Sequence, residues 1–423
     1  MTEQKTERLV RAVGLWGLVA MCINAVVGSG VFLLPSESYK LLGAFSLWAP
    51  LLFAVPVFIL VLCFAEAASH FSEPGGAYLY ARTAFGDFVG FDTGWMNWLA
   101  RVTSLASLSN GFVLSLARLY APLGTGSARA AIIIGSIGIL AAVHFVGVKY
   151  GAASIYVFTL GKLVPLIGFI VLALIMFRFN PIPASLHLPG PGTDWSGAAL
   201  FMLFAYAGFE NLGVPAGEYK NPRRDLPLAL PIGILAIAAI YVLAQLGAMS
   251  ALPDLSKTQT PIADAAAALV GTWGAVIITL GALLSMAGTN SGTVLEGSRM
   301  LYALSLDRRM GPISYVHPKF RTPSVAIIVH VVVATVLALG GSFAQLALLS
   351  TVARLTTYLA GCASLPFLGG VTPKRVILAT LGVLVSSIFV ITLHGPNAIA
   401  AAIALVIGAL IYLAVGKSPV PAR

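Results

Sequence analysis

The chain has 423 residues, of which 58% are hydrophobic and only 9% carry a formal charge. Soluble globular domains contain about 25% charged residues, so this composition excludes a soluble fold and indicates an integral membrane protein. The formal net charge of +10 does not require a nucleic-acid partner, because the basic residues follow a membrane topology.

Twelve apolar runs follow one another along the chain, each near the roughly 20 residues that a helix needs to cross a bilayer. They occupy residues 13–34, 42–64, 95–121, 131–147, 155–177, 197–216, 228–250, 268–295, 323–340, 345–369, 376–393 and 397–415. We expect an all-α integral membrane fold in which all twelve runs are transmembrane helices of one domain spanning residues 1–423.

The first run contains a helix-breaking patch around Gly28, Ser29 and Gly30. The glycines leave consecutive backbone N–H groups almost unobstructed. The half-helix that starts there points its positive dipole end at mid-membrane, where a carboxylate is its natural ligand. The alternative is a close helix–helix contact through small residues, which is common in membranes.

The sixth run has a matching break at Ala207 and Gly208. In lipid, unwound backbone is costly unless its polar groups line a cavity or bind a ligand. Freed carbonyls here would accept hydrogen bonds from an ammonium group, so the two breaks together predict a clamp for a zwitterion. Phe204, Tyr206 and Phe209 flank this break as candidate gates, or as ordinary core aromatics.

The breaks fall in spans one and six, at corresponding places in two halves of five spans. An odd number of spans inverts the second half relative to the first, an arrangement typical of secondary transporters. We expect discontinuous helices at these two spans, a first inverted repeat in residues 1–177, a second in 195–369 and a peripheral helix pair in 373–415. The halves share no visible sequence similarity, so the repeat depends on the break positions alone.

Three basic residues lie within the apolar runs: Lys162, Arg101 and Arg354. An ionisable group inside a span is costly and is a functional hypothesis by default. Arginine keeps its charge and must find an anion, a carbonyl or water. We expect the two arginines to pair with the intramembrane carboxylates near the cytoplasmic half and to close the inner gate in outward-facing states, or else to contact a polar or acidic substrate side chain directly. Those carboxylates are Glu66, Glu210 and Glu296.

The remaining basic residues indicate the orientation. With a cytoplasmic N-terminus, 17 of the 25 Lys and Arg residues fall on the inner side, 5 on the outer side and three within the runs. An excess of Lys and Arg marks cytoplasmic loops. An even number of spans then places both termini in the cytoplasm, and we expect a multi-pass protein of a bacterial plasma membrane.

The sequence offers no pattern for enzymatic or metal chemistry. Cys22, Cys63 and Cys362 are isolated, the six histidines lack metal-ligand spacing, and no phosphate-binding loop motif occurs. A channel would need repeated rings of like polar residues, which are absent. We expect no enzyme activity, no metal, no cofactor and no nucleic-acid partner, in a monomer or homodimer.

Four ordered stretches carry a resemblance to a known superfamily. They are GSGVF at residues 28–32, FAEAASHFSEPGGAYLYARTAFGDFVGFDTGW at 64–95, FAYAGFENLGVPAGEYKNPRRDLPLAL at 204–230 and SRMLYALSLDRRMGP at 298–312. On these stretches the chain resembles permeases of the amino acid–polyamine–organocation (APC) superfamily, and is similar to its amino-acid permeases and light-chain transporters. They touch most of the first eight spans, whereas the last four match only in hydropathy.

The resemblance implies a leucine-transporter-type fold and an amino-acid substrate. It assigns the substrate carboxylate to the backbone of Gly28, Ser29 and Gly30. The substrate ammonium goes to the carbonyls of Val26, Phe204 and Ala207, with Phe204 as the gate. Some relatives carry a neutral residue at the position of Glu210, so no role is carried over there.

The resemblance also implies a role for Lys162. In several proton-coupled relatives a lysine at this place puts its amine where sodium sits in sodium-coupled members, bridging spans one, five and eight. Ser285 and Thr289 are its expected oxygen partners in the eighth run. A buried lysine can release its proton within a working range; the alternative is a permanently charged strut that imitates sodium.

The pocket near Gly28 and Phe204 looks apolar, which favours neutral over cationic substrates. We therefore expect a secondary active transporter of neutral amino acids that works by alternating access, with proton symport or exchange. The runner-up is antiport of cationic amino acids or polyamines.

Overall fold

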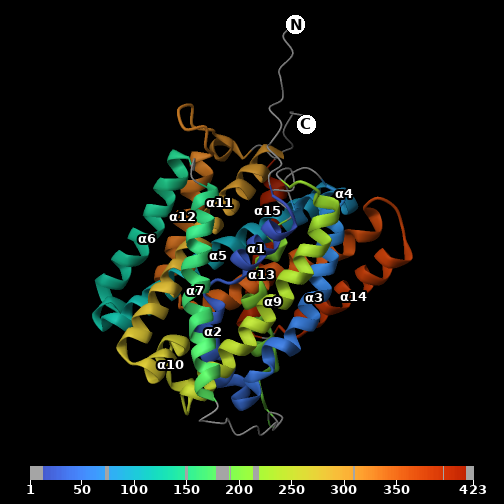
Figure 1. Ribbon diagram of the computed structural model, residues 1–423. Helices are drawn as coiled ribbons and strands as arrows, with labels where there is room; N and C mark the ends of the chain where they lie inside the picture. Colours follow the sequence, from blue (N-terminus) through green and yellow to red (C-terminus); the bar gives the residue numbers. More distant parts are fainter. Residues whose placement is uncertain are drawn as a thin grey trace.

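The computed structural model is a bundle of helices (Figure 1). It describes residues 13–71, 76–147, 151–177, 190, 192–212, 219–307, 310–393 and 395–415; of residues 151–157 and 222 it describes the backbone alone. Within these ranges the β structure amounts to one isolated bridge between Val13 and Tyr219. The predicted all-α class is confirmed.

The chain forms long helices joined by short turns. The α-helices are α1 (Leu15–Val26), α2 (Gly30–Leu42), α3 (Ala49–Ala68), α4 (Gly76–Phe85), α5 (Asp87–Leu119), α6 (Gly126–Val146), α7 (Gly151–Phe177), α8 (Trp195–Tyr206), α9 (Pro222–Ala251), α10 (Pro261–Val270), α11 (Thr272–Asp307), α12 (Ser324–Gly340), α13 (Phe343–Ser364), α14 (Pro373–Ile391) and α15 (Pro396–Ala414). Short 3₁₀ turns are η1 (Gly43–Leu47), η2 (Ala121–Gly124), η3 (Phe209–Asn211), η5 (Leu255–Lys257), η6 (Gly311–Ser314) and η7 (Leu365–Phe367).

Several of these helices have the length and apolarity to cross a membrane. In the described part of the chain eight do so singly, and α1 with α2 adds a ninth as a pair bent by 50°. The other predicted spans fold into α5, α8 and α12, of which α8 has 12 residues and α12 has 17. Each predicted apolar run thus overlaps a helix, and the chain is a multi-pass membrane protein.

The third predicted span, α5, is long but rich in polar residues. A span of this kind is tolerated in a bilayer because its polar side chains face other helices. Ser107 donates a hydrogen bond to the Phe343 carbonyl at 2.8 Å, and Ser350 of α13 donates to the Ala100 carbonyl at 2.8 Å. Hydrogen bonds of this kind join helices within a bilayer. At the other extreme, only 6% of the apolar stretch of α15 is buried, so this helix lies at the periphery.

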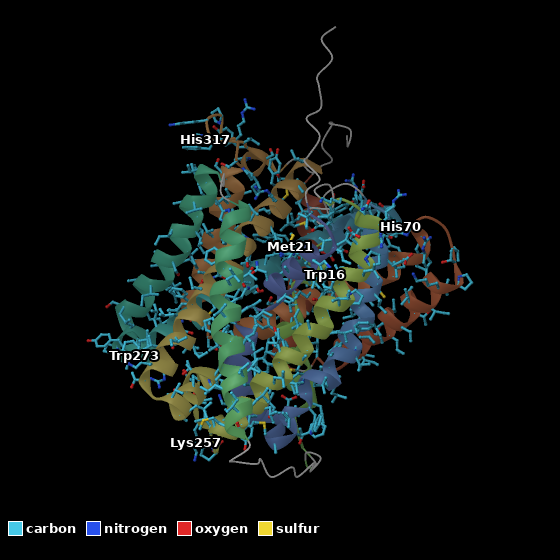
Figure 2. All side chains as sticks on the ribbon, viewed as in Figure 1. Trp16, Met21, His70, Lys257, Trp273 and His317 are labelled. Atoms are coloured by element: carbon cyan, nitrogen blue, oxygen red, sulfur yellow. The ribbon has the colours of Figure 1, made fainter. Side chains whose placement is uncertain are left out.

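The two ends of the bundle carry different residues. His70 and His317 lie at one end, Lys257 and Trp273 at the opposite end (Figure 2). We name these the inner end and the outer end, after the topology expected from the sequence.

At the outer end, the short helix α10 lies between the 3₁₀ turn η5 and α11. This helix packs against α2 and α9. Its Asp264 pairs with Arg118 at the end of α5 and accepts hydrogen bonds from Thr258 and Thr260. The network fastens α10 to the outer end of α5.

Candidate functional site

The first break separates α1 from α2 at residues 27–29. The Gly28 N–H turns back to the Val26 carbonyl at 2.8 Å. The next three N–H groups, of Ser29, Gly30 and Val31, make no hydrogen bond to the described residues. Unpaired N–H groups head a helix and carry the positive end of its dipole. The first break therefore presents donors to the middle of the bundle.

The carbonyls of this break are already occupied by side chains. Lys162 of α7 is fully buried, and its Nζ donates to the Asn24 and Val27 carbonyls at 2.7 Å each. Ser285 of α11 donates to the Val27 and Gly28 carbonyls at 3.1 Å. An ammonium group of the chain itself thus sits against the unwound backbone.

Ser285 shares the Val27 carbonyl with Lys162 but makes no hydrogen bond to it, and Thr289 also differs from its expected role as a partner of Lys162. Its hydroxyl has no hydrogen-bond partner among the described residues. It lies beside the break instead, where a Cβ added to Gly28 would be 3.4 Å from its Oγ1.

The second break follows α8. Ala207 is extended and Gly208 has φ of 127°, a conformation that favours glycine. The Gly208 N–H donates to Glu210 Oε2 at 2.8 Å, so this donor is occupied. The Ala207 carbonyl accepts no hydrogen bond from the described residues. The second break therefore presents an acceptor.

The two breaks touch each other. A Cβ on Gly30 would be 3.0 Å from the Cα of Ala205, and a Cβ on Gly208 would be 2.7 Å from the Ala25 carbonyl oxygen. The Tyr241 hydroxyl donates to the Ala205 carbonyl at 2.7 Å and lies 3.4 Å from the Val26 carbonyl. Only glycine allows approaches this close, so the glycines set the distance between the breaks.

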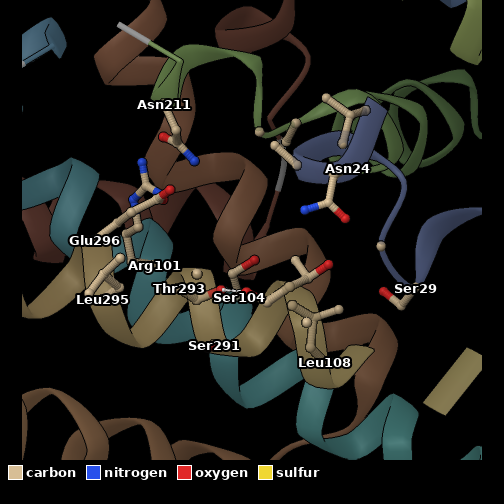
Figure 3. A pocket seen from close by; sticks show the side chains of 18 of the residues that line it. Asn24, Ser29, Arg101, Ser104, Leu108, Asn211, Ser291, Thr293, Leu295 and Glu296 are labelled. Atoms are coloured by element: carbon tan, nitrogen blue, oxygen red, sulfur yellow. Dashed lines mark hydrogen bonds and ion pairs between the residues drawn. The ribbon is translucent and has the colours of Figure 1, made fainter. Parts of the chain in front are cut away.

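A cavity of about 360 Å³ lies against both breaks (Figure 3). This volume falls within the range of small-molecule sites. The first break contributes Asn24, Val26, Gly28, Ser29 and Gly30; the second contributes Phe204, Ala207, Gly208 and Asn211; and the facing walls contribute Arg101, Ser104, Leu108, Thr289, Ser291, Thr293, Leu295, Glu296 and Arg354. His144, near the inner end of α6, also lines the cavity, which therefore extends from the breaks toward the inner end.

Toward the outer end the same space is packed. The Phe204 and Phe343 rings meet edge to face, with centroids 6.2 Å apart. Around Gly111, an added Cβ would be 2.9 Å from Leu33 and 3.1 Å from Met286. Apolar side chains thus separate the cavity from the network on Asp264.

Two ion pairs stand at the inner wall. Arg101 of α5 pairs with Glu296 of α11, and Arg354 of α13 lies 3.4 Å from Glu210 of η3. Tyr358 donates a hydrogen bond to Glu210 at 3.3 Å. Both arginines and Glu210 are less than a tenth exposed. Four elements meet through these pairs, and Glu210 links them to the second break.

Three other predicted residues lie away from the cavity. Glu66 does not join the buried arginines: at the inner end of α3 it pairs with Lys374 and Arg375. Tyr206 is fully buried and donates to the Pro50 carbonyl at 2.8 Å, and Phe209 stacks on Tyr358. Both aromatics therefore have the core role that was their alternative, because neither lines the cavity.

The cavity is also more polar than the sequence suggested. Several of the polar residues that line it were not predicted as site residues. Asn24 lies three residues before Val27, and Asn211 lies three residues after Gly208. A polar residue within one helical turn of a break in an apolar run is the signal that would have found both. Ser104 had no such signal, since α5 carries many hydroxyl groups that bond to neighbouring helices.

Comparison with known proteins agrees with this geometry. A family described as amino acid permease matches residues 13–416. The chain belongs to the amino acid permease family. It is 30% identical to the serine/threonine exchanger SteT of Bacillus subtilis over 345 residues, covering 78% of this chain and 77% of that protein.

Two further relatives are transporters by name. The chain is 30% identical over 331 residues to an arginine/ornithine antiporter of Pseudomonas aeruginosa, covering 73% of this chain and 66% of that protein. It is 27% identical over 327 residues to an uncharacterized transporter of Mycobacterium tuberculosis, covering 70% and 67%. The predicted membership of the APC superfamily is confirmed, and the family supports amino-acid transport.

Proposed function

We propose that this protein is a secondary active transporter that carries neutral amino acids across the plasma membrane by alternating access. The observation that carries the proposal is the contact between two breaks of opposite polarity at one cavity. Among the described residues, the N–H groups of Ser29, Gly30 and Val31 and the carbonyl of Ala207 have no hydrogen-bond partner. A zwitterion is the ligand that both breaks satisfy at once.

The binding mode differs slightly from the one that the resemblance implies. The Gly28 N–H is engaged by Val26, so the carboxylate goes to the N–H groups that begin at Ser29. The Val26 carbonyl already accepts hydrogen bonds from the Gly28 N–H and, at 3.4 Å, from the Tyr241 hydroxyl, and the Phe204 carbonyl accepts one from the Ala207 N–H. Phe204 keeps a second lone pair for the ammonium, and Ala207 is the principal acceptor. Phe204 covers the ligand on the outer side.

The architecture that we propose has twelve spans. The first inverted repeat comprises α1 with α2, α3, α5, α6 and α7; the second comprises α8, α9, α11, α12 and α13; α14 and α15 form the peripheral pair. Both termini lie in the cytoplasm. The outer side is packed and the cavity extends toward the inner end, so we propose an inward-facing conformation. Both buried ion pairs are formed in it, which differs from the expectation that they close an inner gate in outward-facing states.

We propose that Lys162 couples transport to protons. Its contacts on the first break are neutral carbonyls, so loss of its proton would replace two charge-assisted hydrogen bonds by weaker neutral ones and loosen the hold of α7 on Asn24 and Val27. The alternative role is a fixed positive strut that supports exchange without proton movement.

The neutral substrate draws support from SteT, a serine/threonine exchanger by name. The second candidate, antiport of cationic amino acids or polyamines, draws support from the arginine/ornithine antiporter at the same identity. The two candidates differ in whether arginine competes with neutral amino acids.

The test is uptake by the purified protein in liposomes. We expect saturable uptake of neutral amino acids, stimulated by an inward proton gradient or by internal amino acid, and no competition by arginine or putrescine. Absence of saturable uptake of any amino acid would overturn the proposal, and competition by arginine would favour the second candidate.

A further inference from the structure

Buried polar atoms without a partner gather in the cavity. The described residues contain seventeen such side-chain atoms, and six of them belong to residues that line this one space. An unsatisfied buried polar group is costly and calls for an explanation. These six atoms are Asn24 Oδ1, Ser29 Oγ, His144 Nδ1, Asn211 Oδ1, Thr289 Oγ1 and Arg354 Nε.

Five of the six atoms divide between two parts of the cavity, and the sixth, His144 Nδ1, lies near the inner end of α6. Ser29 and Thr289 lie at the first break, where the backbone groups common to all amino acids would bind. Asn24, Asn211 and Arg354 lie on the inner side of the breaks. Figure 3 shows the Asn211 side chain beside the Arg101–Glu296 pair and the Asn24 side chain directed into the same space from the side of Ser29. A ligand held by the breaks would extend its side chain into this part.

The charges around this part are internally balanced. Arg101 is paired with Glu296, and Arg354 with Glu210. A cationic side chain would meet two guanidinium groups, and an anionic one would meet two carboxylates. Either charge would have to break a buried ion pair, which leaves an uncompensated charge at high cost. An uncharged side chain leaves both pairs intact.

The unsatisfied atoms specify what that uncharged side chain must carry. Asn24 and Asn211 present amide oxygens that accept, and Arg354 Nε donates. An aliphatic side chain would leave all three without partners. A hydroxyl group satisfies one acceptor and one donor, whereas a carboxamide, with two N–H donors and one carbonyl oxygen, satisfies all three.

We infer that Asn24, Asn211 and Arg354 form a side-chain subsite for amino acids with polar, uncharged side chains, with carboxamides matched more fully than hydroxyls. The inference rests on the proposed transport of amino acids through this cavity. It adds a specificity element that the backbone clamp alone does not contain, because the clamp reads only the groups common to all amino acids.

The test begins with the unaltered protein in liposomes and needs no variant. Competition is measured within pairs of similar shape, asparagine against leucine and threonine against valine, with arginine and glutamate as charged competitors. We expect asparagine and threonine to compete at least about tenfold better than their apolar partners, since a site built to bond a polar group rejects an analogue that lacks it. Asparagine and glutamine should be the strongest competitors.

The second arm uses Asn24→Leu and Asn211→Leu, which keep the approximate size of each side chain. Each should reduce the asparagine-over-leucine preference at least about fivefold, a change of roughly one lost hydrogen bond. The matched control is Thr103→Val on α5, whose hydroxyl bonds the Leu99 carbonyl at 2.8 Å outside the cavity. It should leave the preference unchanged.

The outcomes separate the two proposals. No saturable transport of any amino acid contradicts the proposed function itself. Saturable transport with leucine or valine preferred, or with a charged amino acid preferred, overturns the subsite and leaves the transporter. A polar preference that both asparagine variants retain also overturns the assignment to these residues.

Discussion

The two helix breaks differ in which of their backbone groups the protein itself satisfies. At the first break Lys162 and Ser285 bond the carbonyls, and the N–H groups of Ser29, Gly30 and Val31 have no partner among the described residues. At the second break Glu210 bonds the Gly208 N–H, and no described residue bonds the Ala207 carbonyl. Lys162, a cation of the chain itself, occupies acceptors of the first break, and Glu210, an anion of the chain itself, occupies a donor of the second break.

This difference shows how similar interruptions of a helix acquire opposite polarity. A break alone exposes both backbone donors and backbone acceptors, so it has no preference between an anionic and a cationic group of a ligand. A buried side chain of one sign removes half of them and leaves the other half for a ligand. We propose that in this protein the sign of the residue behind each break, Lys162 or Glu210, decides which end of a zwitterion that break receives.

The largest effect is expected from Gly208→Ala, which disrupts the close contact between the two breaks. The added Cβ would lie 2.7 Å from the Ala25 carbonyl oxygen, at a φ of 127° that other residues rarely adopt. Uptake should fall at least about hundredfold, corresponding to roughly 2.7 kcal/mol or more. Gly135→Ala on α6, where a Cβ meets nothing within 4 Å, is the matched control and should transport normally. Normal uptake by Gly208→Ala would show that the breaks need not touch.

The next effect concerns the cation behind the first break. Lys162→Met removes the ammonium and leaves the Asn24 and Val27 carbonyls without it. Stimulation of uptake by a proton gradient should be lost, with the remaining rate down about tenfold or more, because each unsatisfied buried group costs about 1–3 kcal/mol. Uptake is measured with and without the gradient, and Lys257→Met, an exposed outer-end lysine, is the control. If uptake by Lys162→Met were still stimulated by the gradient, Lys162 would not couple transport to protons, and its role would be that of the fixed positive strut.

Removing only the charge of Glu210, the anion behind the second break, should reduce uptake less than Lys162→Met does. Glu210→Gln keeps an oxygen for the Gly208 N–H but leaves Arg354 without its carboxylate. We expect about a tenfold loss of uptake, partly restored by adding Arg354→Gln, because breaking one member of a buried pair costs more than removing both. A double-mutant cycle measures this coupling. Additive losses would mean that the pair does not act as a unit.

The smallest effect is expected from Ser29→Ala. Its hydroxyl has no partner among the described residues, while the backbone N–H that is proposed to hold the carboxylate remains. The apparent KM should rise only a few fold, about 1 kcal/mol or less, with the maximal rate unchanged. Initial rates over a range of substrate concentrations decide this. A complete loss of uptake would mean that the side chain, rather than the backbone, binds the substrate.

Much of the fold followed from the sequence, because a bilayer reduces folding to counting apolar runs and finding where they break. The runs overlap the helices, and the glycines at residues 28, 30 and 208 lie where the helices are interrupted. The hydropathy pattern could not show that α5, with its hydroxyl-rich sequence, sits among other helices, since its polar groups are satisfied by residues far along the chain such as Phe343.

The site was predictable where the backbone itself carries the chemistry and less so where side chains meet across helices. Lys162 contacts the first break, and Ser285 bonds the same Val27 carbonyl, but neither Ser285 nor Thr289 hydrogen-bonds Lys162, the role that the family pattern implied for both. The sequence does not show that Glu66 forms an ion pair with Arg375 rather than with a buried arginine, because this pairing depends on how α14 packs against α3. Partner selection among intramembrane charges is a property of the tertiary structure.

The most direct measurement of the zwitterion clamp is competition by substrate analogues that lack one charge. The strongest amino-acid substrate of the unaltered protein is competed with the matching amine, which has no carboxylate, and with the matching carboxylic acid, which has no ammonium. We expect each analogue to compete at least about hundredfold more weakly than the amino acid, because each leaves one break unsatisfied. Competition by either analogue at a concentration similar to that of the amino acid would contradict the clamp.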